Sequence, residues 1–311
     1  MPAVSIIMNV RNGAATLPAA LNSVLAQTFQ DWELIVWDDC STDESAQIVA
    51  DFCDSRVRYL LAPQPTSLGR ARDAAIRQAK GEWLAFLDQD DVWLSHKLEQ
   101  QMAIAHNPQV ALVYGRTVRF YANGREFDDD HFHEFTSLPE GNIAPELLGK
   151  GCFVAMSSAL IRRAAVEQVG GIPGDIHVTP DYFLYLAIAS KYQARAVQQV
   201  VCRYRVHSGS MTNLYRRESL AETLKLVDQW REQVAPNAYA ERRARVATAL
   251  AVEEIRTSSM RLQGARRMLR EGSLTWLVAR PFVHIWRRVR RKLWRPYWKN
   301  FSGASELPRM L

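Results

Sequence analysis

The sequence predicts an α/β fold with a mostly parallel sheet flanked by helices, followed by a C-terminal helical extension. Over the first third of the chain, short apolar runs rich in β-branched residues alternate with segments of helical periodicity, which is the pattern of βαβ units. From residue 218 onward only helical spacing recurs. The 311 residues, 48% of them hydrophobic, suffice for one large core with an appendage.

The elements follow from apolar runs and from the turn residues that bound them. We expect strands at Val4–Val10, Trp32–Trp37, Val57–Leu61, Trp83–Leu87, Val110–Tyr121, Gly151–Ile161 and Ala196–Val201. We expect helices at Ala14–Ala26, Ser41–Cys53, Ser67–Lys80, Ser95–Asn107, Arg163–Gly170 and Tyr182–Ser190, and in the extension at Glu218–Val234, Tyr239–Arg270 and Trp276–Trp298. Ser41 with Glu44 forms a capping-box pattern. Asn123-Gly124 predicts a hairpin, and the acidic stretch Glu126–Glu140 predicts a mobile loop over the site.

Three carboxylates follow the apolar run Trp83–Leu87 at once: Asp88, Asp90 and Asp91. Carboxylates this close repel one another unless a cation neutralises them, and oxygen-only ligands suit a hard ion such as Mg²⁺ or Mn²⁺ that also holds phosphate. The alternative is a solvated acidic turn that starts the helix at Ser95.

Polar residues also follow two other predicted strands, at Asn9–Asn12 and at Asp38–Asp39. In a parallel sheet, ligands bind beyond the carboxyl ends of the strands. We therefore expect these two segments to share one edge of the sheet with Asp88–Asp91. This convergence is stronger evidence for a site than any single motif.

Composition excludes several classes of protein. The four cysteines are scattered, which disfavours a disulfide framework or a zinc site and fits a reducing cytoplasm: Cys40, Cys53, Cys152 and Cys202. The sequence has no signal-peptide pattern and no uncharged apolar run long enough to span a bilayer. The net charge of +6 is local, because seven basic residues between positions 287 and 299 contribute +7 and leave the rest of the chain at −1, so a nucleic-acid partner is not expected.

The order of the motifs resembles family 2 glycosyltransferases, which have the GT-A nucleotide-diphospho-sugar transferase fold. The resemblance is carried by Val-Ser-Ile-Ile-Met-Asn-Val-Arg-Asn at Val4–Asn12, Asp-Asp-Cys-Ser-Thr-Asp at Asp38–Asp43, Gly-Arg-Ala-Arg-Asp at Gly69–Asp73 and Ala-Lys-Gly-Glu-Trp-Leu-Ala-Phe-Leu-Asp-Gln-Asp-Asp at Ala79–Asp91. It extends to about Thr212. It implies a catalytic domain over residues 1–214, with a nucleotide-binding half (1–107) and an acceptor-binding half (108–214), and a helical region over 215–311.

The resemblance also implies residue roles. The donor nucleotide would lie against Asn9, Val10, Arg11, Asn12, Asp39, Arg72, Asp88, Gln89, Arg205 and His207. Asp88 and Asp90 would bind Mn²⁺ or Mg²⁺, and Asp181 would be the catalytic base. The implied activity is inverting transfer of a hexose or N-acetylhexosamine, with a UDP-sugar favoured, to a saccharide or lipid-linked acceptor in cell-surface polysaccharide or lipopolysaccharide synthesis.

The chain departs from the family pattern at two positions. Pro180 stands where an acid usually precedes the base, and Asp73 replaces the usual asparagine beside Arg72. The Gln-x-x-Arg-Trp motif of processive synthases is absent from the sequence, as are their membrane spans, which favours transfer of one sugar at a time.

Each assignment has a structural alternative. Asp39 or Asp181 could serve simply as a helix cap, with no role in the site. Arg72 could be a surface side chain, and Arg205 and His207 could be ordinary surface residues. The cluster from Asp128 to Glu134 resembles a metal site but is more typical of a solvated loop. A nucleotide-sugar binder or a nucleotidyltransferase would keep the metal site and need no base at Asp181.

The segment 281–299 suggests a second kind of function. Its apolar residues follow helical spacing, and seven basic residues lie among them: Arg287, Arg288, Arg290, Arg291, Lys292, Arg295 and Lys299. Tryptophan and arginine on one amphipathic helix suit an anionic membrane surface. We therefore expect a cytoplasmic protein, peripheral on the inner face of the cell membrane. The alternative is a helix packed on the catalytic domain.

Overall fold

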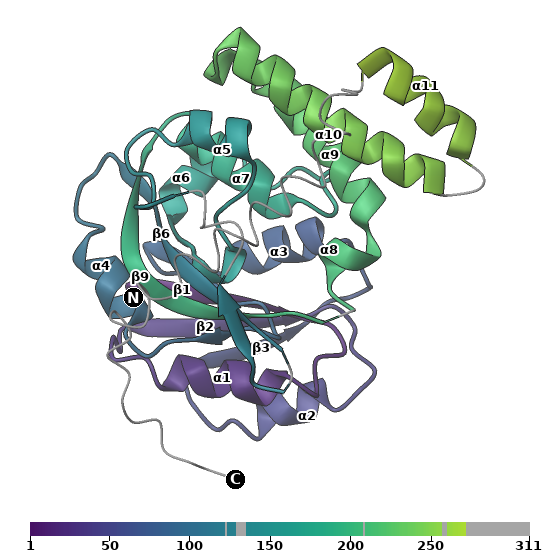
Figure 1. Ribbon diagram of the computed structural model, residues 1–311. Helices are drawn as coiled ribbons and strands as arrows, with labels where there is room; N and C mark the ends of the chain where they lie inside the picture. Colours follow the sequence, from purple (N-terminus) through teal and green to yellow (C-terminus); the bar gives the residue numbers. More distant parts are fainter. Residues whose placement is uncertain (122, 129–134, 208, 257–259, 272–311) are drawn as a thin grey trace. The chain divides into compact units, whose positions relative to one another are not determined.

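A computed structural model describes residues 1–121, 123–128, 135–207, 209–256 and 260–271 (Figure 1). The chain divides into two compact units, residues 1–243 and 244–311. The region after residue 214, expected to be one helical extension, is thus divided between them. The predicted membrane helix 281–299 and most of the acidic cluster between Asp128 and Glu134 lie outside the described residues.

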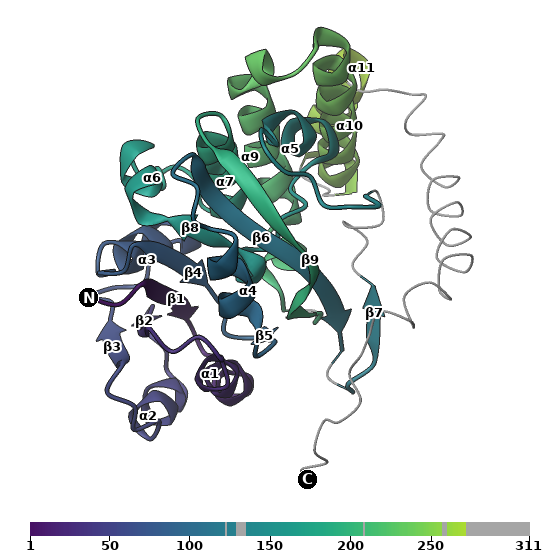
Figure 2. The same cartoon turned by 90° about the vertical axis from the view of Figure 1, so that its left-hand side faces the viewer.

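The first unit is built on one sheet, which has nine strands in the described part of the chain. The strands are β1 (Val4–Val10), β2 (Trp32–Asp38), β3 (Val57–Leu61), β4 (Trp83–Phe86), β5 (Val92–Trp93), β6 (Val110–Phe120), β7 (Glu126–Asp128), β8 (Leu160–Arg162) and β9 (Gln193–Arg205). Their order is β3-β2-β1-β4-β8-β6-β9-β5, with β7 paired to β6. Strands β3, β2, β1 and β4 are parallel, and β8 is antiparallel to both of its neighbours (Figure 2).

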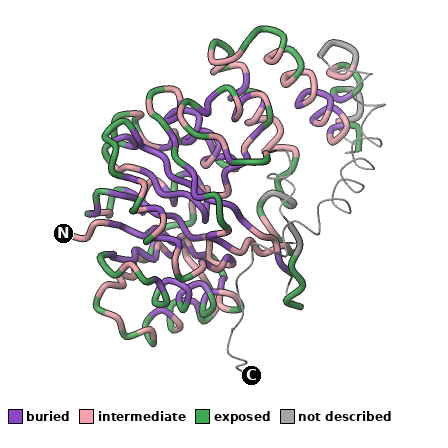
Figure 3. The backbone as a smooth tube through the Cα atoms, turned by 60° about the vertical axis from the view of Figure 1, so that its left-hand side comes forward, coloured by how far each residue is buried: buried purple, intermediate pink, exposed green. Residues whose placement is uncertain are grey.

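Helices cover both faces of the sheet (Figures 1 and 2). The described helices that lie wholly within the first unit are α1 (Leu17–Leu25), α2 (Ser45–Ala50), α3 (Leu68–Ile76), α4 (Lys97–Ala103), α5 (Ala144–Lys150), α6 (Arg163–Gln168), α7 (Pro180–Ala189), α8 (Met211–Leu214) and α9 (Arg216–Gln229). Strands alternate their side chains between the faces, so Ile6 and Met8 of β1 pack with α1, whereas Ile7 packs with α3 and α7. Figure 3 shows the strands as the most buried part of the unit.

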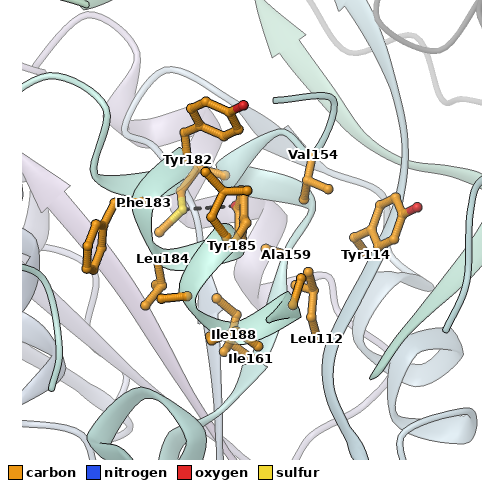
Figure 4. Close-up of a cluster of buried hydrophobic side chains, with 14 of the residues drawn as sticks. Leu112, Tyr114, Val154, Ala159, Ile161, Tyr182, Phe183, Leu184, Tyr185 and Ile188 are labelled. Atoms are coloured by element: carbon orange, nitrogen blue, oxygen red, sulfur yellow. Dashed lines mark hydrogen bonds between the residues drawn. The ribbon is translucent and has the colours of Figure 1, made fainter. Parts of the chain in front are cut away.

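The core on the α7 side continues into the second half of the sheet (Figure 4). Tyr182, Phe183 and Leu184 of α7 are buried there, and the Tyr185 hydroxyl donates to Met156 Sδ at 3.2 Å. Helix α7 is apolar all round except at its first turn, as expected of a helix buried on every side. The buried helix α7 therefore holds Asp181, in its N-terminal turn, in a fixed position.

The described part of the remaining chain is helical. Helix α10 (Pro236–Arg256) begins three residues before the predicted start at Tyr239 and continues from the first unit into the second. Within the second unit, Gln263 and Arg267 of α11 (Arg261–Glu271) donate to Glu254 of α10. No helix in the described residues is both long and apolar enough to cross a bilayer.

Most predicted elements are present, with three corrections. The single helix predicted over Tyr239–Arg270 is wrong, because α10 ends at Arg256 and α11 begins at Arg261. The capping box is wrong: Ser41 Oγ accepts from the Asn12 amide, while α2 begins only at Ser45, whose amide and hydroxyl donate to Asp43. The long strand predicted over Gly151–Ile161 is also wrong, because a 3₁₀ turn at Met156–Ser158 interrupts it and only β8 forms. The Asn-Gly hairpin is confirmed, with Gly124 at φ 76° between β6 and β7.

Candidate active site

The polar ends of β1, β2 and β4 meet at one edge of the sheet, as predicted. The Arg11 amide donates to Gln89 Oε1 at 2.9 Å, and Gln89 Nε2 donates back to the Arg11 carbonyl at 3.2 Å. Arg11 Nη1 also bonds to Asp39 Oδ2 at 3.1 Å. A Cβ at Gly13 would lie 2.4 Å from Gln89 Oε1, so a larger residue there would displace the Gln89 side chain. Three chain segments are thus joined into one surface.

Asp39 is buried and does not cap α2. Its carboxylate accepts from the Thr66 amide at 2.9 Å and the Thr66 hydroxyl at 3.1 Å, besides Arg11. Its neighbour Cys40 has φ 62°, a left-handed conformation that is strained for this residue. Asn12 shares that conformation, and its Oδ1 accepts from the Thr42 amide at 2.8 Å. The loop after β2 is therefore held in one shape beside the loop after β1.

Arg72 is buried, not a surface side chain: it is 3% exposed and donates to Asp88 Oδ1 at 2.7 Å. Burial raises the pKa of Asp88, Arg72 lowers it, and the charges of Asp90 and Asp181 raise it again. A carboxylate in this position favours an additional cation nearby.

The three carboxylates after β4 have different partners. Asp91 is 1% exposed and accepts from Ser157 Oγ at 2.6 Å and the Arg205 amide at 2.8 Å, so it fastens β9 to the site loop. The Asp90 carboxylate contacts His207 Nε2 at 2.7 Å, and the Asp90 carbonyl accepts from Arg205 Nε at 2.7 Å. Arg205 and His207 therefore lie against the acidic loop rather than on a separate surface.

The alternative of a solvated turn that starts the next helix is wrong. Helix α4 begins at Lys97 after His96, and none of the three carboxylates caps it. No group of three or more His, Cys, Asp or Glu side chains suited to a metal exists among the described residues. A metal here would thus take Asp88 and Asp90 as its protein ligands and complete its shell with water and donor phosphates, as Mg²⁺ commonly does.

Asp181 occupies the first turn of α7 and is half-buried. The helix has Thr179 at its N-cap and Pro180 at its first position, where proline is favoured, so Asp181 is not the cap. Its Oδ1 accepts only a local bond, from the Tyr182 amide at 2.8 Å. Burial raises the pKa of Asp181, and the charge of Arg72 lowers it. The Arg72 guanidinium therefore acts on both Asp88 and Asp181.

The segment that leads into α7 is held by Glu222 of α9, which sequence reasoning missed. This carboxylate accepts from the amides of His177, Val178 and Thr179 at 2.8 to 3.0 Å, and from the Thr179 hydroxyl at 2.8 Å. Glu222 is only 7% exposed. Its only sequence signal is an acid within the predicted helix Glu218–Val234, which does not distinguish a buried acid from a solvated one.

Asp73, the second departure from the family pattern, has a structural role. Its Oδ1 accepts from the Ile172 amide at 3.2 Å, and its Oδ2 pairs with Arg77. Gly171 at φ 72° lies so close that a Cβ would be 2.5 Å from Asp73 Oδ1. Asp73 thus ties α3 to the chain that leads toward α7.

Residues 5–170, more than half of the chain, match the family model described as "Glycosyl transferase family 2". The chain belongs to glycosyltransferase family 2. It is 40% identical over 212 residues to the Escherichia coli protein WfgD and 34% identical over 213 residues to WfaP, covering 68% of this chain in each case and 79% and 80% of those proteins. Both are described as UDP-Glc:alpha-D-GlcNAc-diphosphoundecaprenol beta-1,3-glucosyltransferases.

Solved structures show the same fold at low identity. Staphylococcus aureus TarS 1-349 in complex with UDP-GlcNAc superposes with a TM-score of 0.61 at 19% identity, over 89% of this chain and 79% of that one. The Pyrobaculum calidifontis mannosyltransferase PcManGT, in complex with GDP-Man and Mn²⁺, superposes with a TM-score of 0.60 at 19% identity, over 98% of this chain and 88% of that one. The GT-A fold is therefore confirmed, and the family 2 enzyme is a glycosyltransferase of hexosyltransferase type.

Proposed function

We propose that this glycosyltransferase moves one sugar from a UDP-sugar to a hydroxyl of a lipid-linked saccharide, with inversion at the anomeric carbon, in cell-surface polysaccharide synthesis. The observation that carries the proposal is the pair of carboxylates influenced by Arg72: Asp88 at the end of β4 and Asp181 at the start of α7. The relatives described as acting on UDP-Glc and a diphosphoundecaprenol-linked GlcNAc support the choice of donor and acceptor.

The donor would lie along the joined loops. Asn9 and Val10 at the end of β1, Arg11 and Asn12 just after it, and Asp39 after β2 would position the nucleoside. Hydrogen bonds to neighbouring loops hold Arg11, Asn12 and Asp39 in place. Gln89 fixes the first loop. Arg72, Arg205 and His207 would place positive charge near the diphosphate, where negative charge develops as it leaves.

Asp181 would act as the base. As the acceptor hydroxyl oxygen bonds to the anomeric carbon, the bond from that carbon to the donor diphosphate breaks, UDP leaves, and the hydroxyl proton passes to the Asp181 carboxylate. Attack from the face opposite the diphosphate inverts the carbon. The raised pKa of Asp181 makes this carboxylate a stronger base than an ordinary aspartate.

The acidic loop fits Mn²⁺ or Mg²⁺ by its chemistry. Asp88 and Asp90 offer only oxygen donors, and burial together with neighbouring negative charge raises the pKa of Asp88. When bound, the ion would neutralise charge on the leaving diphosphate. Asp91 is not proposed as a ligand, because Ser157 and the Arg205 amide already occupy its oxygens.

The tail at 281–299 is proposed to hold the enzyme on an anionic membrane surface, at the inner face of the cell membrane where a lipid-linked acceptor is accessible. The proposal rests on its sequence, in which basic residues accompany tryptophans on a helical pattern.

The experiment is a screen of nucleotide sugars with and without Mn²⁺, using a GlcNAc-diphosphate-lipid as the acceptor, with the product identified by mass and anomeric configuration. The proposal expects Mn²⁺-dependent transfer from a UDP-sugar and an inverted product. Release of a nucleotide without transfer of a sugar from any donor would favour a nucleotide-sugar binder or nucleotidyltransferase instead.

A further inference from the structure

Two basic side chains flank Gly151, at the C-terminal end of α5. The guanidinium of Arg242, on α10, lies close to this glycine: a Cβ at position 151 would be 2.7 Å from Nη2 and 3.2 Å from Cζ. Gly151 has φ 104°, a backbone conformation that favours glycine. Lys150, the preceding residue, is exposed and holds Nζ 4.0 Å above the ring of Phe135.

Neither cation is neutralised by the part of the protein that the structure describes. No described carboxylate forms an ion pair with Arg242 or Lys150, Glu146 one turn earlier on α5 included, and the buried Nε of Arg242 makes no hydrogen bond. By contrast, the adjacent Arg243 pairs with Asp228 at 2.9 Å. The C-terminal end of α5 supplies only about half a unit of negative charge. Both side chains are therefore without an ion-pair partner among the described residues and are available to an anionic ligand.

This basic pair lies beside the proposed base. The Tyr182 hydroxyl, next to Asp181 in the chain, donates to the Leu147 carbonyl in the last turn of α5 at 2.8 Å, so the end of α5 is fastened to the start of α7. Cys152 follows Gly151. Burial raises the pKa of its thiol, the charge of Asp181 raises it further, and the charge of Arg242 lowers it. The end of α5 is therefore near Asp181. Lys150 on α5 and Arg242 on α10 lie on different elements from Asp88 and Asp90, which follow β4.

We propose that Arg242 and Lys150 bind the diphosphate of a lipid-diphosphate-linked acceptor. The inference rests on the proposed function and adds a site for the acceptor's charge. In such an acceptor one sugar ring separates the diphosphate from the hydroxyl that attacks, so its phosphates must lie close to the base without touching it. A planar guanidinium can bind phosphate oxygens through two parallel hydrogen bonds, and lysine adds a mobile point charge.

The test compares two acceptors that carry the same sugar: a GlcNAc polyprenyl diphosphate and an alkyl glycoside of GlcNAc, which has no diphosphate. In the double variant Arg242→Gln/Lys150→Gln, KM for the diphosphate acceptor should rise about 10- to 100-fold, as expected for lost hydrogen bonds between charged groups. KM for the alkyl glycoside and slow donor hydrolysis without acceptor should not change. A variant with Arg242→Lys in place of Arg242→Gln, still combined with Lys150→Gln, should show a smaller rise in KM for the diphosphate acceptor.

The matched control is Arg231→Gln/Lys191→Gln, which removes the same charge elsewhere: Arg231 is an exposed side chain paired only with Glu232, and Lys191 is exposed beyond α7. It should leave KM for both acceptors unchanged. An unaltered KM for the diphosphate acceptor in the Arg242/Lys150 variant would overturn the inference, as would an equal rise for both acceptors. Absence of transfer to either acceptor by the unchanged protein would instead refute the proposed function.

Discussion

Glu222 offers the sharpest test of how the proposed base is positioned. It lies on α9, beyond residues 5–170 that match the family model, yet its buried carboxylate accepts four hydrogen bonds of 2.8 to 3.0 Å from residues 177–179. These residues lead directly into α7, whose first turn carries Asp181. If the reasoning is correct, a helix outside the matched segment holds the base in place.

The perturbation is Glu222→Gln, which keeps the shape of the side chain but removes its charge and replaces one acceptor oxygen with an NH₂ group. A hydrogen bond to a charged group contributes about 1.5–3 kcal/mol, and a buried donor left without an acceptor costs about 1–3 kcal/mol. Since about half of the bonds are lost, we expect the free energy of unfolding to fall by about 2–4 kcal/mol. Urea denaturation at pH 7 measures it.

Glu232→Gln is the matched control, because the Glu232 side chain is 82% exposed; it should change the free energy of unfolding by less than about 0.5 kcal/mol. In Glu222→Gln, kcat for transfer should also fall while the donor Kd stays near normal, since the nucleotide loops do not contact Glu222. A Glu222→Gln protein as stable and as active as the unchanged one would show that Glu222 does not hold the segment that leads into α7. Lower stability with normal kcat would limit Glu222 to a structural role.

Three further outcomes follow from the structure and the tail sequence. Lys97 is fully buried, and burial lowers its pKa to about 7 from the usual 10.5. Above pH 7 the unfolded chain therefore binds more protons than the folded one, so the free energy of unfolding should rise between pH 7 and 9, by up to about 1.4 kcal/mol per pH unit. Urea denaturation should show this rise in the unchanged protein and not in Lys97→Met. Equal slopes in the two proteins would contradict this. Asp90→Asn should abolish Mn²⁺-dependent binding of UDP in calorimetry while the protein stays folded, and unchanged affinity would remove Asp90 from the metal site. Replacing the four arginines between 287 and 291 by glutamate should release the protein from anionic liposomes at low salt, since each basic residue near such a surface contributes about 1 kcal/mol; failure of the unchanged protein to sediment would favour a packing helix.

The strand-end residues could be predicted because their signal is local. An apolar run followed by polar residues identifies a strand end wherever it occurs, and the rule for parallel sheets then places Asp39 and Asp88 at one edge without knowledge of the packing. The distinct roles of Asp88, Asp90 and Asp91 could not be predicted in this way. They depend on Ser157, Arg205 and His207, which lie 66 to 117 residues further along the chain.

The same limit explains the misses. Thr66 and Glu222 act through partners distant in sequence, and a buried glutamate within a helix has the same local pattern as a solvated one. The capping box at Ser41 failed because its hydroxyl serves the loop after β1 instead. Local pattern identifies candidate groups, whereas tertiary contact decides which partner each one takes.

The proposed role of Asp181, to take the proton from the acceptor, can be tested by the pH dependence of kcat for the unchanged enzyme and for Asp181→Asn. We expect the variant to bind donor normally and to lose about 10²- to 10⁴-fold in transfer. In the unchanged enzyme, transfer should fall as the pH is lowered through the pKa of Asp181, which burial raises above that of an ordinary aspartate, because only the deprotonated carboxylate can accept a proton. Near-normal turnover by Asp181→Asn, with the same fall in rate at low pH, would show that Asp181 is not the base.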